Sequence, residues 1–296
     1  MDILPQLLVN AVITGSIYAL ASAGLSLVYG LQRILNFAHG HFMMLGAYCF
    51  YYFTVERGLS AWASIFPALL FAILVASISL RIFILPFTRY SYLLCFVTTL
   101  ALSIILESLV CMFFGVNVKS LSIGAGSTSY EVAGVYITPV QIVIILSALV
   151  LLLMLGFVVH VTALGRKIRA LRENDVLAES LGINRTTIVY GVFFVATVLA
   201  MYAGILVGYE TNLQPTMGSS YTIKAFAAML LGGLGNVWGT IAGSYLLGLV
   251  ENFSIGLDLG RFSVPAGYKD AFAFMIILLV LLIRPQGVFM WSRRVA

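Results

Sequence analysis

The sequence predicts an all-α polytopic membrane protein, with about seven to eight transmembrane helices and a glycine-broken re-entrant segment near residues 222–255. Of its 296 residues, 61% are hydrophobic and 9% are charged, whereas soluble domains carry roughly 25% charged residues. Apolar runs of about 18–25 residues recur along the chain, the length that a helix needs to cross a hydrocarbon core. Helices are expected because hydrocarbon leaves free backbone polar groups without partners.

The apolar runs place the spans in order. The first five are expected at about 7–29, 42–54, 62–81, 93–114 and 140–161. A sixth is expected at 189–209, followed by two shorter apolar pieces at 223–231 and 240–252 and a last span at 271–283. The glycine-rich stretch GGLGNVWG separates the two shorter pieces, which therefore read as half-helices.

Two connections are long enough to leave the membrane. Residues 117–138 are rich in Gly, Ser, Thr and alternating β-formers, so we expect an exposed periplasmic loop in which a hairpin can form. Residues 163–187 hold a cluster of basic side chains, which places this loop in the cytoplasm and the N-terminus outside. The basic tail with Arg284, Arg293 and Arg294 is also cytoplasmic only if 222–255 returns to the side it entered from. This requirement predicts the re-entrant pair.

The cytoplasmic loop contains ALRENDVLAESLG at 170–182, which predicts one short helix. Asn174 or Asp175 can cap its start, and Gly182 supplies its C-terminal stop. From the spacing alone, the helix can dock into a soluble partner or can be a solvated loop that only fixes topology.

Three stretches carry a family resemblance. ENDVLAESLGINRTTI resembles the cytoplasmic coupling loop of ABC-importer permeases. GSIYALASAGLSLVYGLQRILNFAHGHFMMLGAY resembles the N-terminal signature of the branched-chain amino-acid (Liv-type) ABC permeases, and LLGGLGNVWGTIAGSYLLGLVENF with RPQGVF resembles their C-terminal signature. The resemblance extends in order over nearly the whole chain and is closest to the shorter, H-type permease subunit.

The resemblance implies one permease domain, 1–296, of a bacterial ABC importer in the cell inner membrane. It implies a second homologous permease subunit, two cytoplasmic ATPase subunits and a periplasmic substrate-binding protein as partners. The chain has no G-x-x-x-x-G-K-[ST] phosphate loop, so we expect no enzyme activity and no cofactor here, with ATP and Mg on the partner subunits. The implied coupling residues are Glu173, Asp175, Ala178, Glu179, Leu181 and Gly182.

Polar groups inside the spans are candidates for the translocation path, because burying an ionisable side chain in a bilayer is costly. Glu107 lies within the fourth span, where it can attract a substrate ammonium or make an interhelical hydrogen bond. Asn36 and His39 lie in LQRILNFAHGHFMML at 31–45; they anchor and cap a helix if this stretch is at the membrane surface, and line the path if it lies within the bundle. The H-x-H pair has no third or fourth ligand nearby, so we predict no metal.

Glycines four residues apart predict close helix packing. They form two sets, Gly204 with Gly208, and Gly235 with Gly239 and Gly243. The segments 31–45 and 222–240 are both apolar and broken by glycine, a pattern expected where two structural halves meet.

Two classes of function remain open. The first is an ABC permease for branched-chain amino acids, or for the urea, amides, or aromatic and carboxylic acids that related permeases carry. The second is a stand-alone secondary transporter, which would need its own coupling ion and no docking loop. An intramembrane enzyme is not indicated, because no nucleophile–base or metal-ligand constellation is present in the sequence.

Overall fold

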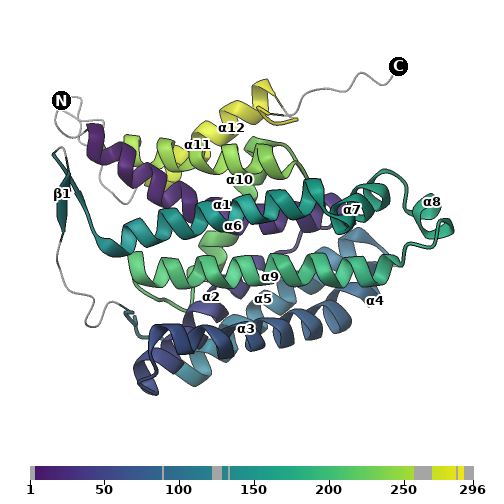
Figure 1. Cartoon of the computed structure of the whole chain (residues 1–296), viewed down its shortest axis with the longest axis horizontal. Helices are drawn as coiled ribbons and strands as arrows, with labels where there is room; N and C mark the ends of the chain where they lie inside the picture. The colour runs from purple at the N-terminus through teal and green to yellow at the C-terminus, as the bar shows by residue number, and fades with distance from the viewer. Residues whose placement is uncertain are drawn as a thin grey trace.

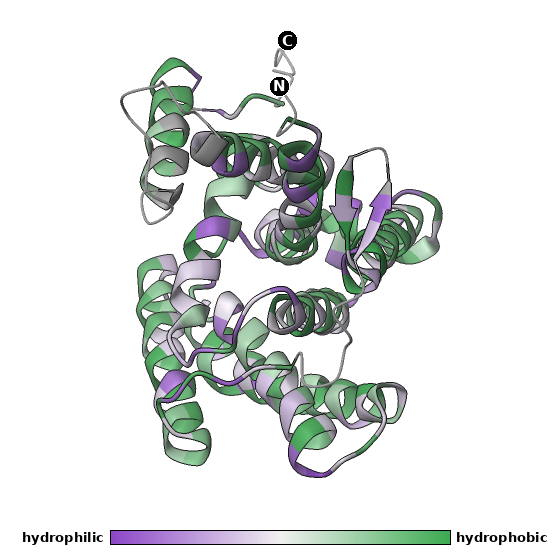
Figure 2. Ribbon diagram, turned by 90° about the vertical axis from the view of Figure 1, so that its left-hand side faces the viewer, coloured by the Kyte–Doolittle hydropathy of each residue, from purple (hydrophilic) through white to green (hydrophobic). Residues whose placement is uncertain are grey.

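The computed structural model describes residues 4–88, 90–121, 129–132, 134–256, 269–284 and 286–289. The connection before the last predicted span and the basic tail therefore lie mostly outside the described residues. Long helices run side by side through the molecule (Figure 1). Hydrophobic residues cover most of their length, and hydrophilic residues concentrate in the hairpin and the connections (Figure 2). The all-α membrane fold is confirmed.

The first part of the chain forms five α-helices and two π-helical segments. They are α1 (Leu4–Gln32), α2 (His39–Tyr51), η1 (Tyr52–Glu56), α3 (Ala61–Ile78), η2 (Ser79–Ile84), α4 (Leu85–Thr88) and α5 (Tyr92–Phe114). Serine hydroxyls cap two of these helices: Ser60 accepts from the Ala63 amide, and Ser91 from the Leu93 amide.

A short hairpin links the two parts. Its strands are β1 (Tyr130–Val132) and β2 (Val135–Ile137), which pair antiparallel. The remaining helices are α6 (Pro139–Val161), α7 (Ala163–Glu173), α8 (Asp175–Ser180), α9 (Arg185–Glu210), α10 (Met217–Gly232), α11 (Val237–Gly256) and α12 (Lys269–Ile283). Thr138 and Gln141 form a reciprocal capping box at the start of α6.

Within the described residues, five helices are long and apolar enough to cross a membrane, or six if the bent pair α10–α11 is one span. The predicted total of about seven to eight is reached only if the shorter helix α2 with η1, and α12, also insert. α10 and α11 meet at a bend of 117°, where the sequence predicted a glycine break.

The third span is longer than predicted. α3, η2 and α4 form one apolar stretch from Ala61 to Thr88, whereas the predicted span ended at about residue 81. The π-helical bonds of η2 end at the amide of Leu85, which donates to Leu80 O. Pro86, which has no amide hydrogen to donate, follows directly as the second residue of α4.

The two sides of the molecule can be defined by contacts. On the hairpin side, the Gln6 side chain near the start of α1 bonds to Tyr136 of β2 at 3.1 Å, and Trp62 of α3 shares a hollow with Tyr209 of α9. On the opposite α7 side, Gly30 of α1 packs against Gly235, which follows α10. The sequence-based orientation makes the hairpin side periplasmic and the α7 side cytoplasmic.

Two helix pairs of the fold, α1 with α2 and α9 with α10, run in opposite directions. α1 runs to the α7 side, residues 33–38 turn back into the bundle, and α2 continues from mid-depth to the hairpin side. α9 runs to the hairpin side, residues 211–216 turn back, and α10 continues from mid-depth to the α7 side. The matching breaks are therefore 33–38, which lies inside the predicted segment 31–45, and 211–216, which precedes the predicted segment 222–240.

A ladder of hydroxyl groups joins α1 to α11. Ser22 Oγ lies 2.6 Å from Ser244 Oγ, and Thr240 donates to Ser26 Oγ at 3.0 Å. The backbones also approach closely, because a methyl group on Gly248 would lie 2.8 Å from Ala11 O. Small residues and interhelical hydrogen bonds hold apolar helices together where lipid provides no hydrophobic drive.

Candidate functional site

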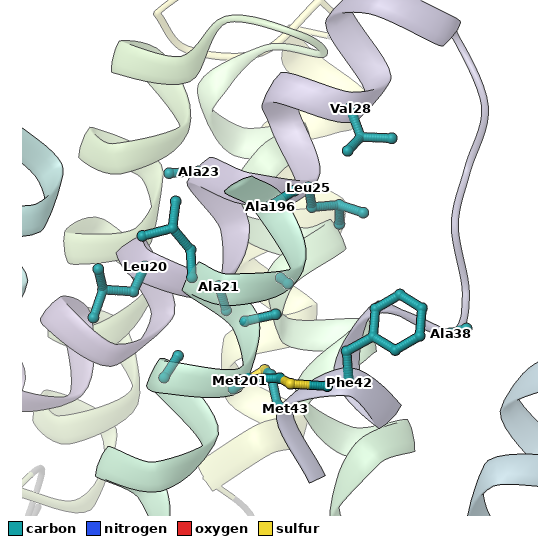
Figure 3. Close-up of a cluster of buried hydrophobic side chains, with 14 of the residues drawn as sticks. Leu20, Ala21, Ala23, Leu25, Val28, Ala38, Phe42, Met43, Ala196 and Met201 are labelled. Carbon is teal, nitrogen blue, oxygen red and sulfur yellow. The ribbon is translucent and has the colours of Figure 1, made fainter. Parts of the chain in front are cut away.

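The break between α1 and α2 lies inside the bundle. His39 Nε2 donates to Ala21 O at 2.8 Å, and Ala21 belongs to the interior of α1. Asn36 is fully buried and His39 is 1% exposed. Figure 3 shows the chain leaving α1 beyond Val28 and returning past Ala38 to Phe42 and Met43. Neither side chain is a surface anchor.

Local geometry explains how this break forms. Arg33 has a positive φ of 55°, which ends α1 and reverses the chain. Asn36 Oδ1 then accepts from the Ala38 amide at 3.1 Å, an Asx turn directly before α2. The predicted capping role of Asn36 is wrong, because the N-cap residue of α2 is Ala38 and no side chain caps this helix. Asn36 instead stabilises the turn two residues before the N-cap residue.

The two half-helices α2 and α10 meet at their starts. The Gly40 amide donates to Thr222 Oγ1 at 3.0 Å, and this oxygen lies 3.2 Å from Phe37 O. Any side chain on Gly40 would collide with the Gly218 backbone and with Thr222. Close approach of these backbones requires glycine, so Gly40 and Gly218 lock the two broken units together.

His41 joins this centre to α5. Its Nε2 lies 3.4 Å from Glu107 Oε2, and the side chains are 3% and 32% exposed respectively. Glu107 lines a hollow of about 510 Å³ together with Ile104, Ser108, Cys111 and Met112. Of the three predicted path residues, only Glu107 lines this hollow; Asn36 and His39 do not. Sequence reasoning had assigned His41 no partner, because the two residues lie far apart in the chain.

The predicted coupling helix at 170–182 is two helices. α7 ends at Glu173, and α8 begins at Asp175 after the chain changes direction at Asn174. Asn174 Oδ1 accepts from the Leu177 amide at 3.0 Å, which caps α8 and explains why one continuous helix does not form. The prediction of a single helix is therefore wrong, although the cap and the stop lie where we placed them.

Gly182 ends α8 in a Schellman motif. Its φ is +85°, its amide donates to Glu179 O at 2.9 Å, and the Ile183 amide donates to Ala178 O at 3.1 Å. Ala178 is buried and supports the turn from inside. Glu173, Glu179, Leu181 and Gly182 are exposed, and Asp175 is half-buried and paired with Arg185 at 3.4 Å.

α8 presents apolar side chains to the outside. Val176 is 74% exposed, Leu177 59% and Leu181 76%. Figure 1 shows α8 at one end of the molecule, beyond the long helices. A cluster of exposed apolar side chains on a polar connection is typical of a surface that docks a partner.

α7 connects this projecting unit to the turn between α10 and α11. A methyl group on Gly235 would lie 3.4 Å from Arg172 Nη2 and 3.1 Å from Gly30 Cα. Gly287 and Val288 cover the same turn, with the Val288 amide donating to Leu231 O at 2.8 Å. The two stretches that carried the C-terminal resemblance therefore pack against each other, and Arg172 lies beside them.

The predicted packing glycines behave differently from one another. Gly239 and Gly243 pack against the backbone of α10, and Gly204 packs against Met43 of α2. Gly208 lies under the side chains of Leu121 and Leu213. Gly235 has a φ of +76° and lies in the turn before α11, so its placement on a shared helix face was wrong.

A buried ion pair escaped the sequence analysis. Lys224 Nζ of α10 lies 3.2 Å from Glu251 Oε1 of α11, and Tyr18 of α1 donates to Glu251 Oε2 at 2.7 Å. Among the described residues, no group of three or more His, Cys, Asp or Glu side chains is arranged to hold a metal ion.

Comparison with known proteins finds a family whose model matches most of the chain. Residues 7–281 match the family described as "Branched-chain amino acid transport system / permease component". The high-affinity branched-chain amino acid transport system permease protein BraD of Pseudomonas aeruginosa is 31% identical, covering 96% of this chain and 94% of BraD. The corresponding protein LivH of Escherichia coli (strain K12) is 30% identical, with 96% and 94% covered. The ribose import permease protein RbsC of Escherichia coli (strain K12) is 35% identical over 43% of this chain and 40% of its own length.

Proposed function

We propose a function from one premise: the chain belongs to the family of branched-chain amino acid transport permease components. It is the transmembrane permease subunit of an ATP-driven importer, and its cargo is branched-chain or related amino acids. Its place is the bacterial inner membrane, as a multi-pass protein. The named relatives, at about the same length as this chain, support the assignment.

The observation that carries this proposal is the projecting unit formed by α7 and α8. α8 exposes Val176, Leu177 and Leu181 on the side that the basic residues assign to the cytoplasm. A transporter that works alone has no need of such a surface. We therefore propose that α8 contacts a cytoplasmic ATPase, and that ATP and Mg bind there and not on this chain.

The other partners follow from the same assignment. A second homologous permease pairs with this chain in the membrane, two ATPase subunits bind from the cytoplasm, and a periplasmic protein delivers the substrate. Partial similarity to a ribose permease supports a division of labour in which the delivering protein selects much of the cargo. This chain itself carries out no covalent chemistry in the proposed cycle.

The test compares two apolar-to-acidic substitutions. Val176→Asp places a charge on the α8 surface. Val116→Asp places a charge at a similarly exposed residue (75%) just beyond the C-terminal end of α5. Each variant is co-expressed with the ATPase, second permease and binding protein of its own transport system. We expect Val176→Asp to lose co-purifying ATPase and ATP-dependent leucine uptake, and Val116→Asp to keep both.

Two results would overturn the proposal. One is uptake by the chain alone, driven by an ion gradient, which would indicate a secondary transporter. The other is full ATP-dependent uptake by Val176→Asp, which would remove α8 as the docking surface.

A further inference from the structure

Glu107 lies in an unusual place for a carboxylate. In α5 it is about 6 Å beyond the midpoint of the helix, at 1.5 Å per residue, and thus well inside the apolar span. Two residues that line the same hollow are also strongly exposed, Ile104 by 67% and Met112 by 79%. A carboxylate on such a face is costly if lipid covers it, so we infer that lipid does not cover this part of α5.

The side chain is held in position from within the bundle. His41 is 3% exposed and bonds to Glu107 Oε2 through its Nε2. His41 lies in the first turn of α2, beside the Gly40–Gly218 contact. The other carboxylate oxygen, Oε1, has no hydrogen-bond partner among the described residues. One oxygen is therefore fixed and the other remains available to a ligand.

The surroundings of Glu107 describe the ligand that would fit. The hollow of about 510 Å³ combines the carboxylate and the polar groups of Ser108 and Cys111 with the apolar side chains of Ile104 and Met112. An anionic group beside a small apolar patch is complementary to a cation attached to a short hydrocarbon. An aliphatic amino acid has this combination in its ammonium group and side chain.

We propose that Glu107, positioned by His41, recognises the ammonium group of the cargo in the translocation path. The hollow on α5 forms one wall of this path, and the second permease subunit forms the wall facing it. This inference rests on the proposed function and adds a specific residue and a substrate class to it.

The native Cys111 provides a direct probe, because it is a free thiol and lines the hollow. The assembled four-protein complex in proteoliposomes is treated with methanethiosulfonates of opposite charge, trimethylammonium-ethyl and sulfonatoethyl. Modification is read at Cys111 by mass spectrometry. The ratio of the two rates is compared between wild type and Glu107→Gln, since the ratio cancels any change in thiolate content.

We expect the cationic reagent to react at least tenfold faster than the anionic one, and Glu107→Gln to reduce this preference to about twofold. Equal rates in wild type would overturn cation recognition. An absence of reaction with both reagents would show that lipid or close packing covers Cys111, which would overturn the path.

A transport assay separates this inference from the proposed function. Glu107→Gln can keep the hydrogen bond from His41, and we expect it to lower leucine uptake about tenfold while complex assembly and ATPase stimulation by loaded binding protein persist. Glu131→Gln, on the exposed hairpin, is the matched control and should transport normally. Normal uptake by Glu107→Gln would overturn the inference alone, whereas a wild-type chain that binds no ATPase would overturn the proposed function.

Discussion

Lys224 of α10 and Glu251 of α11 form an ion pair inside the bundle, 3.2 Å apart, with side chains 12% and 1% exposed. Lys224 also donates to the Tyr18 hydroxyl at 2.9 Å. We predict that Lys224→Met destabilises the protein by roughly 3–5 kcal/mol, because it leaves a buried carboxylate without its cation. Thermal unfolding in detergent, followed by scanning fluorimetry, measures the change.

A charge reversal tests whether the pair itself matters. Lys224→Glu with Glu251→Lys should recover most of the lost stability, because the Tyr18 hydroxyl lies near both positions. Lys167→Met, on the exposed part of α7, is the control and should unfold like wild type. Equal stability of Lys224→Met and wild type would contradict the prediction.

Gly40→Ala should damage the contact between α2 and α10. The added methyl group would lie 2.6 Å from the Thr222 amide nitrogen, so backbone must move, at a cost of about 1–3 kcal/mol. Gly191→Ala in α9 is the matched control, because nothing lies within 4 Å of the new methyl group. The yield of monodisperse protein after size-exclusion chromatography, with its unfolding temperature, distinguishes the two; similar values for both would argue against a tight contact.

Gly182→Ala should impair coupling without disturbing the membrane domain. The φ of +85° is strained for any residue with a Cβ, by roughly 1–2 kcal/mol, and there is open space around the position. We expect ATP-dependent uptake to fall several-fold while membrane insertion is unchanged. Gly182→Asn should retain more uptake, because asparagine tolerates this conformation better; if both variants transport equally well, the Schellman turn is not needed for coupling.

Arg172→Ala should reduce uptake while the ATPase still co-purifies. Arg172 lies beside Gly30 and Gly235 and thus contacts both α1 and the turn between α10 and α11. Lys167→Ala removes a cation from the same helix and should have no effect. The measurement is uptake normalised to the amount of bound ATPase. An equal loss in both variants would mean that the change in net charge, and not the contact made by Arg172, lowers uptake.

Composition and periodicity predicted the class of the fold and most helix ends within a few residues. α6 was expected at 140–161 and is Pro139–Val161. Its length follows from the apolar run that crosses the bilayer, and its start is defined by a Thr-Pro pair in the sequence. Asn174 was predicted as a possible cap, but a separate helix before it was not, because an asparagine side chain can cap a new helix or sit in a continuing one. The same local pattern allows both structures.

The depth of the polar residues within the bundle and the partners of their side chains could not be predicted. Asn36 and His39 are polar residues between two apolar runs, a pattern that surface turns and internal breaks share. The contact of His41 with Glu107, and that of Lys224 with Glu251, join residues on different helices. The sequence of one helix does not specify which other helix its polar face contacts. Each polar residue could therefore be recognised as unusual in an apolar span, but its partner could not be predicted.

The hydroxyl ladder between α1 and α11 also has a consequence for biosynthesis. Ser22 is made early and bonds to Ser244, which is separated from it by 222 positions in the chain. At about 5–20 residues per second, translation needs roughly 10–45 s to reach the partner. During that interval the serine face of α1 lacks its α11 partner and is in contact with lipid or the translocation machinery. Insertion of α1 and assembly of the bundle are thus separate events, and a nascent chain that stalls before α11 leaves a helix in the membrane that has no tertiary partner for that face.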